Sequence, residues 1–488
     1  MDALFLPVRD LAAQVRTGAL SPVAIAEATL ARVTRCNPAL NAIVTLNPAF
    51  LQDAHDLERR IQRGEDPGPL AGLPVGIKDV TPVKGLRHTH GSPLYRDQVA
   101  EEDALVVRRL RAAGALILGK TNTPEFAAGG NTWNDVFGRT RNPWNLDRSA
   151  GGSTGGGAAA LAAGMIGLAE GTDLGGSLRI PASFCGVAGL RPSVGLVPTC
   201  PSEWAWDTLQ VTGPMARTVE DLAQALQALA GPSPCAPLGQ PVQGRDFAAA
   251  ARHGPRPGVC AAYCPDIAGI GIDPPVEAVC RRAADRLAES GIPVEAVALD
   301  LAFARETFLA LRGYWFVTWM STRLEHLDEL GVNVRNNTRA GLETEVWRLG
   351  EAEQARSRLW QILRGVFERY DYLLTPTMAV PPFPVEHNYP ETIGGRPMQT
   401  YVDWLAPTFV LSLTGLPVAS IPCGLDGERM PVGIQVVGRP SAEEEVLALG
   451  ARIEELCGPA RPPLEAIERW ASAHPDALLG PTPSGGPR

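Results

Sequence analysis

The chain has 488 residues, of which 45% are hydrophobic and 20% charged, and its formal net charge is −9. This composition predicts a globular protein with a large core, and the mild acidity argues against nucleic acid or an anionic membrane surface as a partner. We find no secretory signal and no apolar run long enough to span a bilayer. The nine cysteines show no disulfide-like spacing, so we expect reduced thiols and a cytoplasmic location.

Residues 1–66 are predicted to be mainly helical. Ser21 is a typical N-cap before Pro22, and apolar side chains then recur on one helix face. The next proline, Pro38, is expected to end this helix. A second helix is expected over residues 51–63.

The segment 67–230 carries the motifs that suggest chemistry. The sequence "LPVGIKDV" is predicted to be a buried strand with Lys78 near its end. Residues 102–113 predict an amphipathic helix, and a short strand, "ALIL", follows it. Ten of the 26 residues in 151–176 are glycine, which is typical of backbone in unusual conformations or in close contact with another group.

Residues 231–245 contain several prolines and glycines and are predicted to be a linker or surface loop. Residues 246–460 continue the pattern of strands and helices, and residues 302–370 are mainly helical and contain several aromatic side chains. Strands alternating with helices along the chain predict an α/β fold in which helices cover a mixed sheet.

The last predicted helix has a capping box, Ser441 and Glu444, and is expected to end at Gly458. Residues 461–488 finish in a Pro/Gly-rich stretch and are expected to form a frayed C-terminal tail.

Lysine is rare in this chain. Of 44 basic residues, only Lys78, Lys84 and Lys120 are lysines. Arginine cannot release its proton in a protein, whereas a buried lysine can. A lysine kept in this background is therefore a candidate for proton transfer, although chance is an alternative for any one of them.

The sequence "GALILGKT", residues 114–121, satisfies the phosphate-loop pattern and would make Lys120 a nucleotide ligand. That motif needs a strand before the glycine loop and a helix after it. Here a helix precedes the motif, and "ALIL" is itself strand-like. We therefore expect Lys120 to end a sheet strand, and nucleotide binding is the weaker interpretation.

The sequence "GGSTG" matches the nucleophile elbow of α/β-hydrolases and would make Ser153 a nucleophile with a histidine base. The elbow needs a strand directly before the serine, but residues 142–150 look like a loop. His88 and His90 form an H-x-H pair, which we expect to be solvated loop histidines rather than metal ligands.

A second serine, Ser177, follows Gly175 and Gly176. Glycines allow successive backbone N–H groups to converge on one point, which is how an oxyanion hole is built. A serine hydroxyl beside such a nest needs a base, and a buried Lys78 with a lowered pKa can serve. Ser153 could relay the proton between Ser177 and Lys78. The alternative is a glycine-rich turn with incidental serines.

Residues 151–193 resemble the signature block of the amidase signature family. The resemblance extends over residues 1–460 through "LPVGIKDV", "LGKTNTPEF", "GPMARTVEDLA" and "TGLPVASIPCG", in the family order. It implies a single three-layer α/β/α domain and a Ser-cisSer-Lys triad. Lys78 would be the base, Ser153 the bridging serine beside a cis peptide, and Ser177 the acylated nucleophile.

The resemblance also implies supporting groups. Asp173 and Arg179 match the pair that braces the nucleophile loop, and Thr154 stands where many members have a second serine. Ala127 and Ala128 fall where some members contact substrate. The implied oxyanion donors are the backbone amides of Leu174, Gly175, Gly176 and Ser177.

The predicted reaction is hydrolysis of a linear carboxylic amide through a Ser177 acyl-enzyme, with esters and carbamates as further substrates. No metal or cofactor is implied, and we expect a monomer or homodimer. The alternative within the fold is the glutamine-hydrolysing A subunit of a tRNA-dependent amidotransferase. Five aromatic residues could line an apolar pocket: Trp204, Trp206, Tyr314, Trp315 and Trp319.

Overall fold

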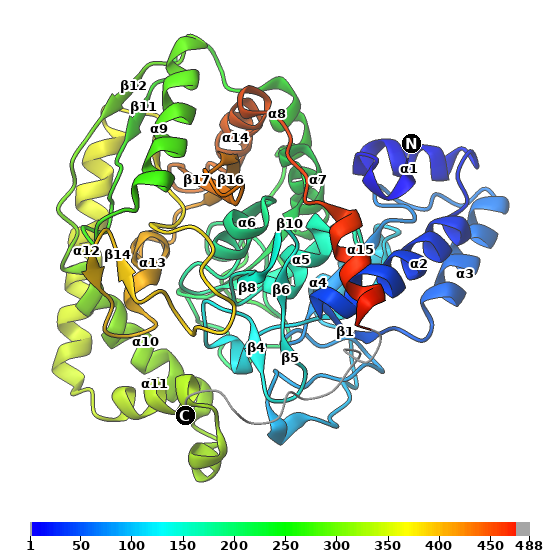
Figure 1. The fold of residues 1–488 in the computed structure, drawn as a ribbon, viewed down its shortest axis with the longest axis horizontal. Coiled ribbons are helices and arrows are strands. Elements are labelled where there is room, and N and C mark those ends of the chain that lie inside the picture. Colours follow the sequence, from blue (N-terminus) through cyan, green and yellow to red (C-terminus); the bar gives the residue numbers. More distant parts are fainter. Residues whose placement is uncertain (1, 475–488) are drawn as a thin grey trace.

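A computed structural model describes residues 2–474, and one eleven-stranded sheet runs through it (Figure 1). In order across the sheet, the strands are β1 (Ile43–Leu46), β3 (Leu116–Thr121), β2 (Pro74–Lys78), β8 (Leu168–Asp173), β10 (Val211–Ala216), β9 (Ala188–Arg191), β16 (Val418–Leu425), β17 (Pro431–Val437), β13 (Tyr372–Pro376), β11 (Ala261–Tyr263) and β12 (Val294–Ala296).

The sheet is mixed, as predicted. Strand β2 runs parallel to both β3 and β8, and β11 runs parallel to β12 and β13, whereas the other neighbours are antiparallel. Because β2 and β8 are adjacent and parallel, their last residues, Lys78 and Asp173, lie at the same edge of the sheet. Ligand sites of α/β folds form at such edges.

Helices cover the sheet and bury both of its faces. One core cluster includes side chains of α4 (Leu105–Ala112), α7 (Val219–Leu229), α8 (Phe247–His253), α9 (Pro274–Glu289) and α14 (Glu443–Cys457). Two others include α2 (Pro22–Leu40), α3 (Phe50–Gln62), α5 (Gly155–Ala162), α6 (Arg179–Cys185), α10 (Ala304–Met320), α11 (Val332–Leu342), α12 (Val346–Phe367) and α13 (Ala406–Ser412). A smaller cluster includes α1 (Val8–Arg16).

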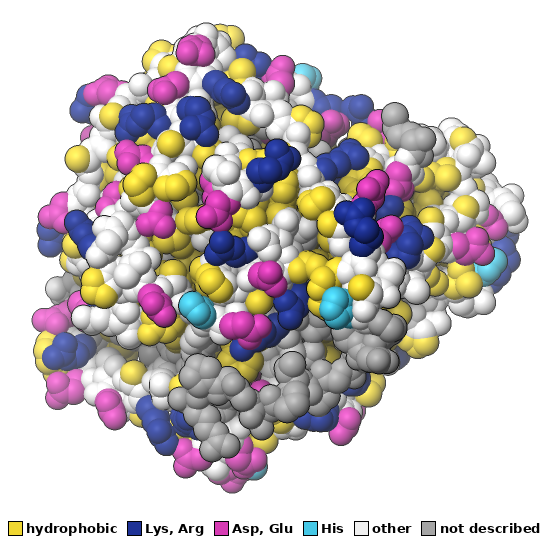
Figure 2. Space-filling model, in the orientation of Figure 1, with side chains coloured by type: hydrophobic (Ala, Val, Ile, Leu, Met, Phe, Trp, Pro, Cys, Tyr) yellow, Lys and Arg dark blue, Asp and Glu magenta, His cyan; other side chains and the backbone are white. Residues whose placement is uncertain are grey.

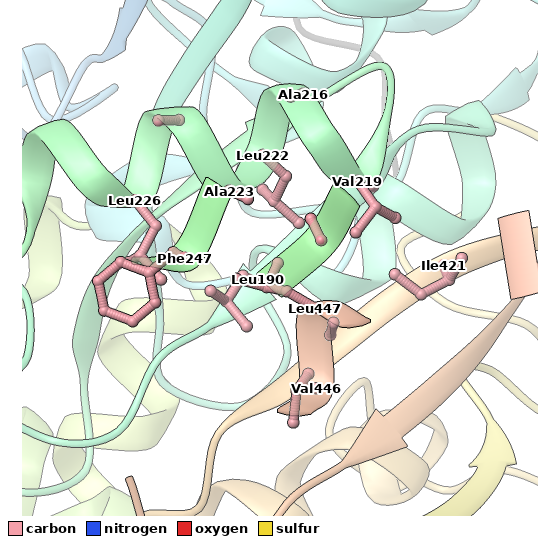
Figure 3. Close-up of a cluster of buried hydrophobic side chains, with 14 of the residues drawn as sticks. Leu190, Ala216, Val219, Leu222, Ala223, Leu226, Phe247, Ile421, Val446 and Leu447 are labelled. Atoms are coloured by element: carbon pink, nitrogen blue, oxygen red, sulfur yellow. The ribbon is translucent and has the colours of Figure 1, made fainter. Parts of the chain in front are cut away.

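Figure 3 shows how the first of these clusters is built around α7. Val219, Leu222 and Leu226 recur at helical spacing. Val219 and Leu222 point toward Ile421 of β16 and Leu447 of α14, and Leu226 lies beside Phe247 of α8. Burying each such side chain contributes roughly 1.5–3 kcal/mol. The periodicity of the sequence therefore determines which face of α7 meets the sheet.

Helix α2 begins as predicted but ends later. The Ser21 hydroxyl accepts the first free N–H groups, so the N-cap is confirmed. The predicted stop at Pro38 is wrong, because the helix continues to Leu40. Pro38 lies in the last turn, where its missing N–H costs only one helical hydrogen bond, and Asn41 closes the helix in a left-handed conformation.

The predicted capping box of the last long helix is wrong. Ser441 has a φ of 58°, and its hydroxyl donates to Gln240 rather than to the helix N-terminus. Glu444 instead pairs with Arg245 from the 231–245 loop. A tertiary ion pair and a left-handed turn therefore replace the local cap. Gly458 ends α14 with a positive φ, as expected.

The segment after residue 460 begins with a helix, in contrast to the predicted tail. Helix α15 (Leu464–Ala473) lies beside α2, where Leu464, Ile467 and Trp470 pack against the core (Figure 1). Its apolar face is buried by a helix more than 400 residues away in the chain, which local patterns do not reveal. The Pro/Gly-rich end of the predicted tail, residues 475–488, lies outside the described residues.

Residues 231–245 form a loop, as predicted, but the expectation of nine reduced thiols is wrong. Cys235 in this loop forms a disulfide with Cys200, and their Cα atoms are 6.2 Å apart. The two cysteines are 35 residues apart, and only the tertiary fold brings them together. The other seven cysteines, all among the described residues, are free.

The surface carries mixed charge. On the face drawn in Figure 2, basic and acidic side chains are interspersed without a broad area of one sign. Within residues 2–474, no helix combines the length and the apolar character needed to cross a bilayer. The same part of the chain brings together no set of three His, Cys, Asp or Glu side chains suited to a metal ion.

Candidate active site

Lys78, the last residue of β2, is fully buried at the centre of a hydrogen-bonded cluster. Its Nζ donates to Ser153 Oγ at 2.6 Å and to Thr172 Oγ1 at 3.0 Å. Burial lowers the pKa of Lys78 to about 7, against the opposing charges of Glu170 and Asp173. An amine with this pKa is partly neutral near pH 7, so it can accept a proton.

Glu170 and Thr172 were missed by sequence reasoning. They lie on β8 beside β2, where the register pairs Ile77 with Glu170. The Glu170 carboxylate accepts the Lys78 backbone N–H at 3.2 Å and the Thr81 hydroxyl at 2.9 Å, and burial raises the pKa of Glu170. The sequence offered one signal for Glu170, which is a charged residue among apolar and uncharged neighbours at the start of the buried strand "LAEGTD".

Ser153 is fully buried and follows a cis peptide bond between Gly152 and Ser153, as the resemblance implied. A side chain at Gly152 would clash with the backbone, because its Cβ would lie 2.9 Å from Gly129 O. The next amide, Thr154 N–H, donates to Ser177 O at 3.2 Å. This hydrogen bond ties the two serine loops together.

The segment before Ser153 differs from the predicted loop. Strands β6 (Arg141–Asn142) and β7 (Asn145–Ser149) form a small hairpin. This hairpin is a separate two-stranded sheet, so Ser153 is not at the end of a central strand as an elbow requires. Ser153 bonds to Lys78, and the structure assigns it no histidine partner among the residues it describes.

Ser177 lies between the glycine pair and α6, and it is half-buried beside a narrow cavity. Gly176 has a φ of +124°, which side chains rarely adopt, and a Cβ there would lie 2.2 Å from Thr408 Oγ1. Glycine is therefore required for the backbone to place Ser177 at this cavity.

The amides of the glycine nest are used unequally. Gly176 N–H donates to Asp173 Oδ1 at 2.8 Å. This predicted oxyanion donor therefore already has a carboxylate as its partner. For the amides of Leu174, Gly175 and Ser177, the structure assigns no hydrogen bond to any residue within 2–474. Three backbone donors thus remain beside the Ser177 hydroxyl.

Asp173 and Arg179 form the predicted brace. Both side chains are fully buried, and Arg179 donates to the Asp173 carboxylate through Nε and Nη2, each at 3.0 Å. Burial alone would raise the pKa of Asp173, but Arg179, Arg191 and backbone amides hold that pKa well below its usual value. Arg191 was not predicted, although an arginine within the otherwise apolar strand "AGLR" is a signal of such a role.

Two cavities lie beside Thr172, and the narrower one also reaches Ser177. The narrow one has a volume of about 20 Å³, and its lining includes Leu174, Gly175, Ser177 and Arg312. The larger one has a volume of about 380 Å³ and is lined largely by aromatic side chains and by polar groups. Both are bounded by Thr172, Gln210 and Trp315, so one ligand could occupy both cavities.

The structure separates the predicted pocket residues. Ala127 lines the narrow cavity, but Ala128 is buried and does not line it: its N–H donates to Glu125 O, and its carbonyl accepts from Asn333. Neighbouring residues of a turn point in different directions, so the two alanines do not share one environment. The hydroxyl of Thr154, one of the implied supporting groups, has no hydrogen-bond partner within the described chain.

The aromatic residues are also divided. Trp204, Trp315 and Trp319 line the larger cavity. Trp206 is 66% exposed and does not line it, because it lies on an outward turn, so its predicted pocket role is wrong. Tyr314 is also exposed and packs edge-on against Trp204, with ring centroids 5.5 Å apart.

His88 and His90 are half-buried, whereas solvated loop histidines were expected. They line the larger cavity, with ring centroids 4.2 Å apart, and His90 stacks on Phe126 at 5.3 Å. Burial lowers the pKa of His88 to about 4 and that of His90 well below its usual value. Both are therefore neutral at pH 7, and they form a polar part of an aromatic wall.

Lys120 lies at the end of strand β3, as expected, one residue before its last residue, Thr121, and so belongs to the sheet rather than to a phosphate loop. Its Nζ pairs with Asp79 at 3.1 Å, and both side chains are buried. A Cβ at Gly119 would lie 2.0 Å from Thr45 O, so this glycine permits close strand pairing rather than a phosphate loop. The nucleotide-binding interpretation is therefore wrong.

Comparison with known proteins agrees with this geometry. The family model described as Amidase matches residues 24–447. The chain is 35% identical to an acylamidase of Rhodococcus erythropolis over 97% of its own length and 98% of that protein. It is 35% identical to the A subunit of a glutamyl-tRNA(Gln) amidotransferase from Symbiobacterium thermophilum, over 88% and 93%. A bacterial aryl acylamidase structure superposes with a TM-score of 0.86 at 28% identity, covering 95% of this chain and 98% of the other.

Proposed function

Because the chain belongs to the Amidase family, and is therefore a hydrolase of carbon–nitrogen bonds in amides, we propose that Ser177 is its nucleophile. The observation that carries this proposal is the buried hydrogen bond from Lys78 to Ser153, next to the Ser177 loop. A partly neutral lysine is a base for a serine hydroxyl, and free backbone amides beside Ser177 are donors for an oxyanion.

The proposed reaction has two acyl-transfer steps. Ser177 Oγ attacks the amide carbonyl, its proton passes to Ser153, and Ser153 gives its own proton to neutral Lys78. The amides of Leu174, Gly175 and Ser177 stabilise the oxyanion. The Lys78 ammonium then returns the proton through Ser153 to the leaving nitrogen as the C–N bond breaks. Water attacks the Ser177 ester by the same relay and releases the acid.

The proposed substrates are linear carboxylic amides with an apolar or aromatic group. The aromatic lining of the larger cavity supports this class, as do the acylamidase and aryl acylamidase relatives. Esters and carbamates are proposed as further substrates, since they form the same oxyanion. The route uses no metal or cofactor. We also propose a monomer or homodimer, which size-exclusion chromatography with light scattering tests.

The assignment of the nucleophile is tested with a fluorophosphonate, which reacts with activated serines. After treatment, peptide mass spectrometry should locate the label on Ser177, and the Ser177→Ala variant should remain unlabelled while releasing no aniline from an anilide substrate. A label on Ser153 in the unmodified chain would overturn the assignment.

A second candidate function is glutamine hydrolysis within a tRNA-dependent amidotransferase. The 35% identity to the glutamyl-tRNA(Gln) amidotransferase chain favours it, whereas the aromatic cavity favours a less polar substrate. Ammonia release from glutamine, measured with and without the partner proteins of a related amidotransferase, separates the two. Glutamine turnover above anilide turnover would support the second function.

A further inference from the structure

We infer that Arg312 binds a carboxylate on the acyl part of the substrate, so that the preferred amides are half-amides of dicarboxylic acids. This inference rests on the proposed function of Ser177. Arg312 belongs to α10, is 5% exposed, and lines the narrow cavity together with Ser177.

Arg312 differs from the other buried arginines in its partners. Arg32 pairs with Asp2, and Arg179 and Arg191 both pair with Asp173. For Arg312, no carboxylate of residues 2–474 lies within ion-pair distance. A buried cation without a counter-ion is costly, so a carboxylate brought by a ligand would complete this site.

The guanidinium of Arg312 is nevertheless held firmly by neutral groups. Its Nε donates to Asn337 Oδ1 at 2.9 Å, and its Nη2 donates to the Tyr401 hydroxyl at 2.7 Å. Its central carbon lies 4.9 Å from the ring centre of Phe316 and 5.7 Å from that of Phe308. These contacts fix the plane of the guanidinium without neutralising its charge.

One group of this guanidinium is left for a ligand. Nη1 has no hydrogen-bond partner in the described part of the chain. Because Arg312 lines the cavity beside Ser177, a ligand in that cavity can supply the partner. Arginine N–H groups match the two oxygens of a carboxylate. Arg312 and Ser177 line the same narrow cavity, so we place the carboxylate a few bonds from the carbonyl that Ser177 attacks.

The positions of the two cavities indicate which half of the amide each one binds. Val80 and Thr81, which follow Lys78 closely in the chain, line the larger cavity and not the narrow one, whereas Thr172, which accepts a hydrogen bond from Lys78, borders both. The leaving nitrogen must lie near Lys78 and Ser153 to receive its proton, so the amine part faces the larger cavity. The acyl part then faces Arg312.

The test compares two anilides of nearly equal shape. N-phenylsuccinamate carries a carboxylate where 4-methylpentananilide carries an isopropyl group. We expect the unmodified enzyme to prefer N-phenylsuccinamate, and Arg312→Gln to lower kcat/KM for this substrate at least about 30-fold while changing that for the neutral anilide less than about threefold. Arg312→Lys keeps the charge but not the forked guanidinium, so its kcat/KM for N-phenylsuccinamate should lie between the values of the unmodified enzyme and of Arg312→Gln.

Arg356→Gln is the matched control, because Arg356 bonds to Leu413 O and Thr208 outside both cavities and should leave the ratio of the two substrates unchanged. An unmodified enzyme without preference for the carboxylate would overturn the inference, as would an equal loss on both substrates in Arg312→Gln and Arg312→Lys.

Direct binding separates this inference from the proposed role of Ser177. In the Ser177→Ala background, calorimetry should show that N-phenylsuccinamate binds more tightly than 4-methylpentananilide, and that Arg312→Gln removes the difference. Equal affinities would overturn the role of Arg312 even if Ser177 is the nucleophile. Full activity of Ser177→Ala would instead refute the proposed function, and the difference in affinity would still decide the role of Arg312.

Discussion

The Nζ atom of Lys78 lies 2.6 Å from the Oγ atom of Ser153, and both side chains are fully buried. Water therefore cannot compete for this hydrogen bond, and burial keeps the lysine partly neutral. The contact joins the end of a central strand to the glycine-rich loop, so the proposed base depends on two segments 75 residues apart.

Replacement of Lys78 tests its role as the base. We expect Lys78→Met, which keeps the length and apolar stem of the side chain, to lower kcat/KM for an anilide by about 10²–10⁴-fold, since general-base catalysis contributes that much. Lys84→Met, at an exposed lysine, should have no effect. Circular dichroism should show both variants folded, and near-normal activity of Lys78→Met would exclude this base.

The pH dependence follows from the lowered pKa of Lys78. The base must be neutral to accept a proton, so kcat/KM should rise as pH increases and should level off above a midpoint near 7. Initial rates between pH 5.5 and 9, with the fold monitored at each pH, measure this limb. A lysine with its ordinary pKa would instead give activity that still increases above pH 9.

Glu170 should adjust that midpoint. Its carboxylate opposes the effect of burial by favouring the ammonium form of Lys78. Glu170→Gln removes the charge and keeps an acceptor for Thr81, so the midpoint of the pH profile should move to lower pH. Glu345→Gln, at an exposed residue that precedes α12, is the control. An unchanged midpoint in Glu170→Gln would contradict this coupling.

Gly176 should tolerate no side chain. A Cβ would clash with Thr408, and the φ of +124° would be strained, so Gly176→Ala should lower the free energy of unfolding by about 1–3 kcal/mol and also reduce kcat. Gly350→Ala is the matched control, because nothing lies near its Cβ within helix α12. It should stabilise the protein by about 0.5–1 kcal/mol in urea unfolding.

The Cys200–Cys235 disulfide is expected to stabilise the loop beside the larger cavity. Cys200→Ser should lower the free energy of unfolding by about 2–4 kcal/mol under oxidising conditions. It should also raise KM more than it lowers kcat, because Cys200 lines that cavity. Cys457→Ser, at a free cysteine, is the control. Alkylation and mass spectrometry without reductant should find seven free thiols, whereas nine would contradict the disulfide.

Much of the fold was predictable from local patterns. Caps and periodicity within short segments predict the start of α2, the strand that ends at Lys78, the strand that contains Lys120, and the apolar face of α7. The scarcity of lysine drew attention to Lys78, and the glycine pair drew attention to Ser177. Each of these signals depends on neighbours within a few residues, so the chain alone carries it.

The sequence by itself therefore determined the family, the α/β class and the candidate triad. Only the tertiary structure decided which distant groups surround that triad: Glu170 and Thr172 beside Lys78, Arg191 on Asp173, Arg312 near Ser177, and Trp206 in solvent rather than in the cavity. Strand register and helix packing set these positions, and both depend on contacts between segments far apart in the chain. A side chain's chemistry can be read locally, but its burial and its partners, which set its pKa and its use, come from the assembled fold.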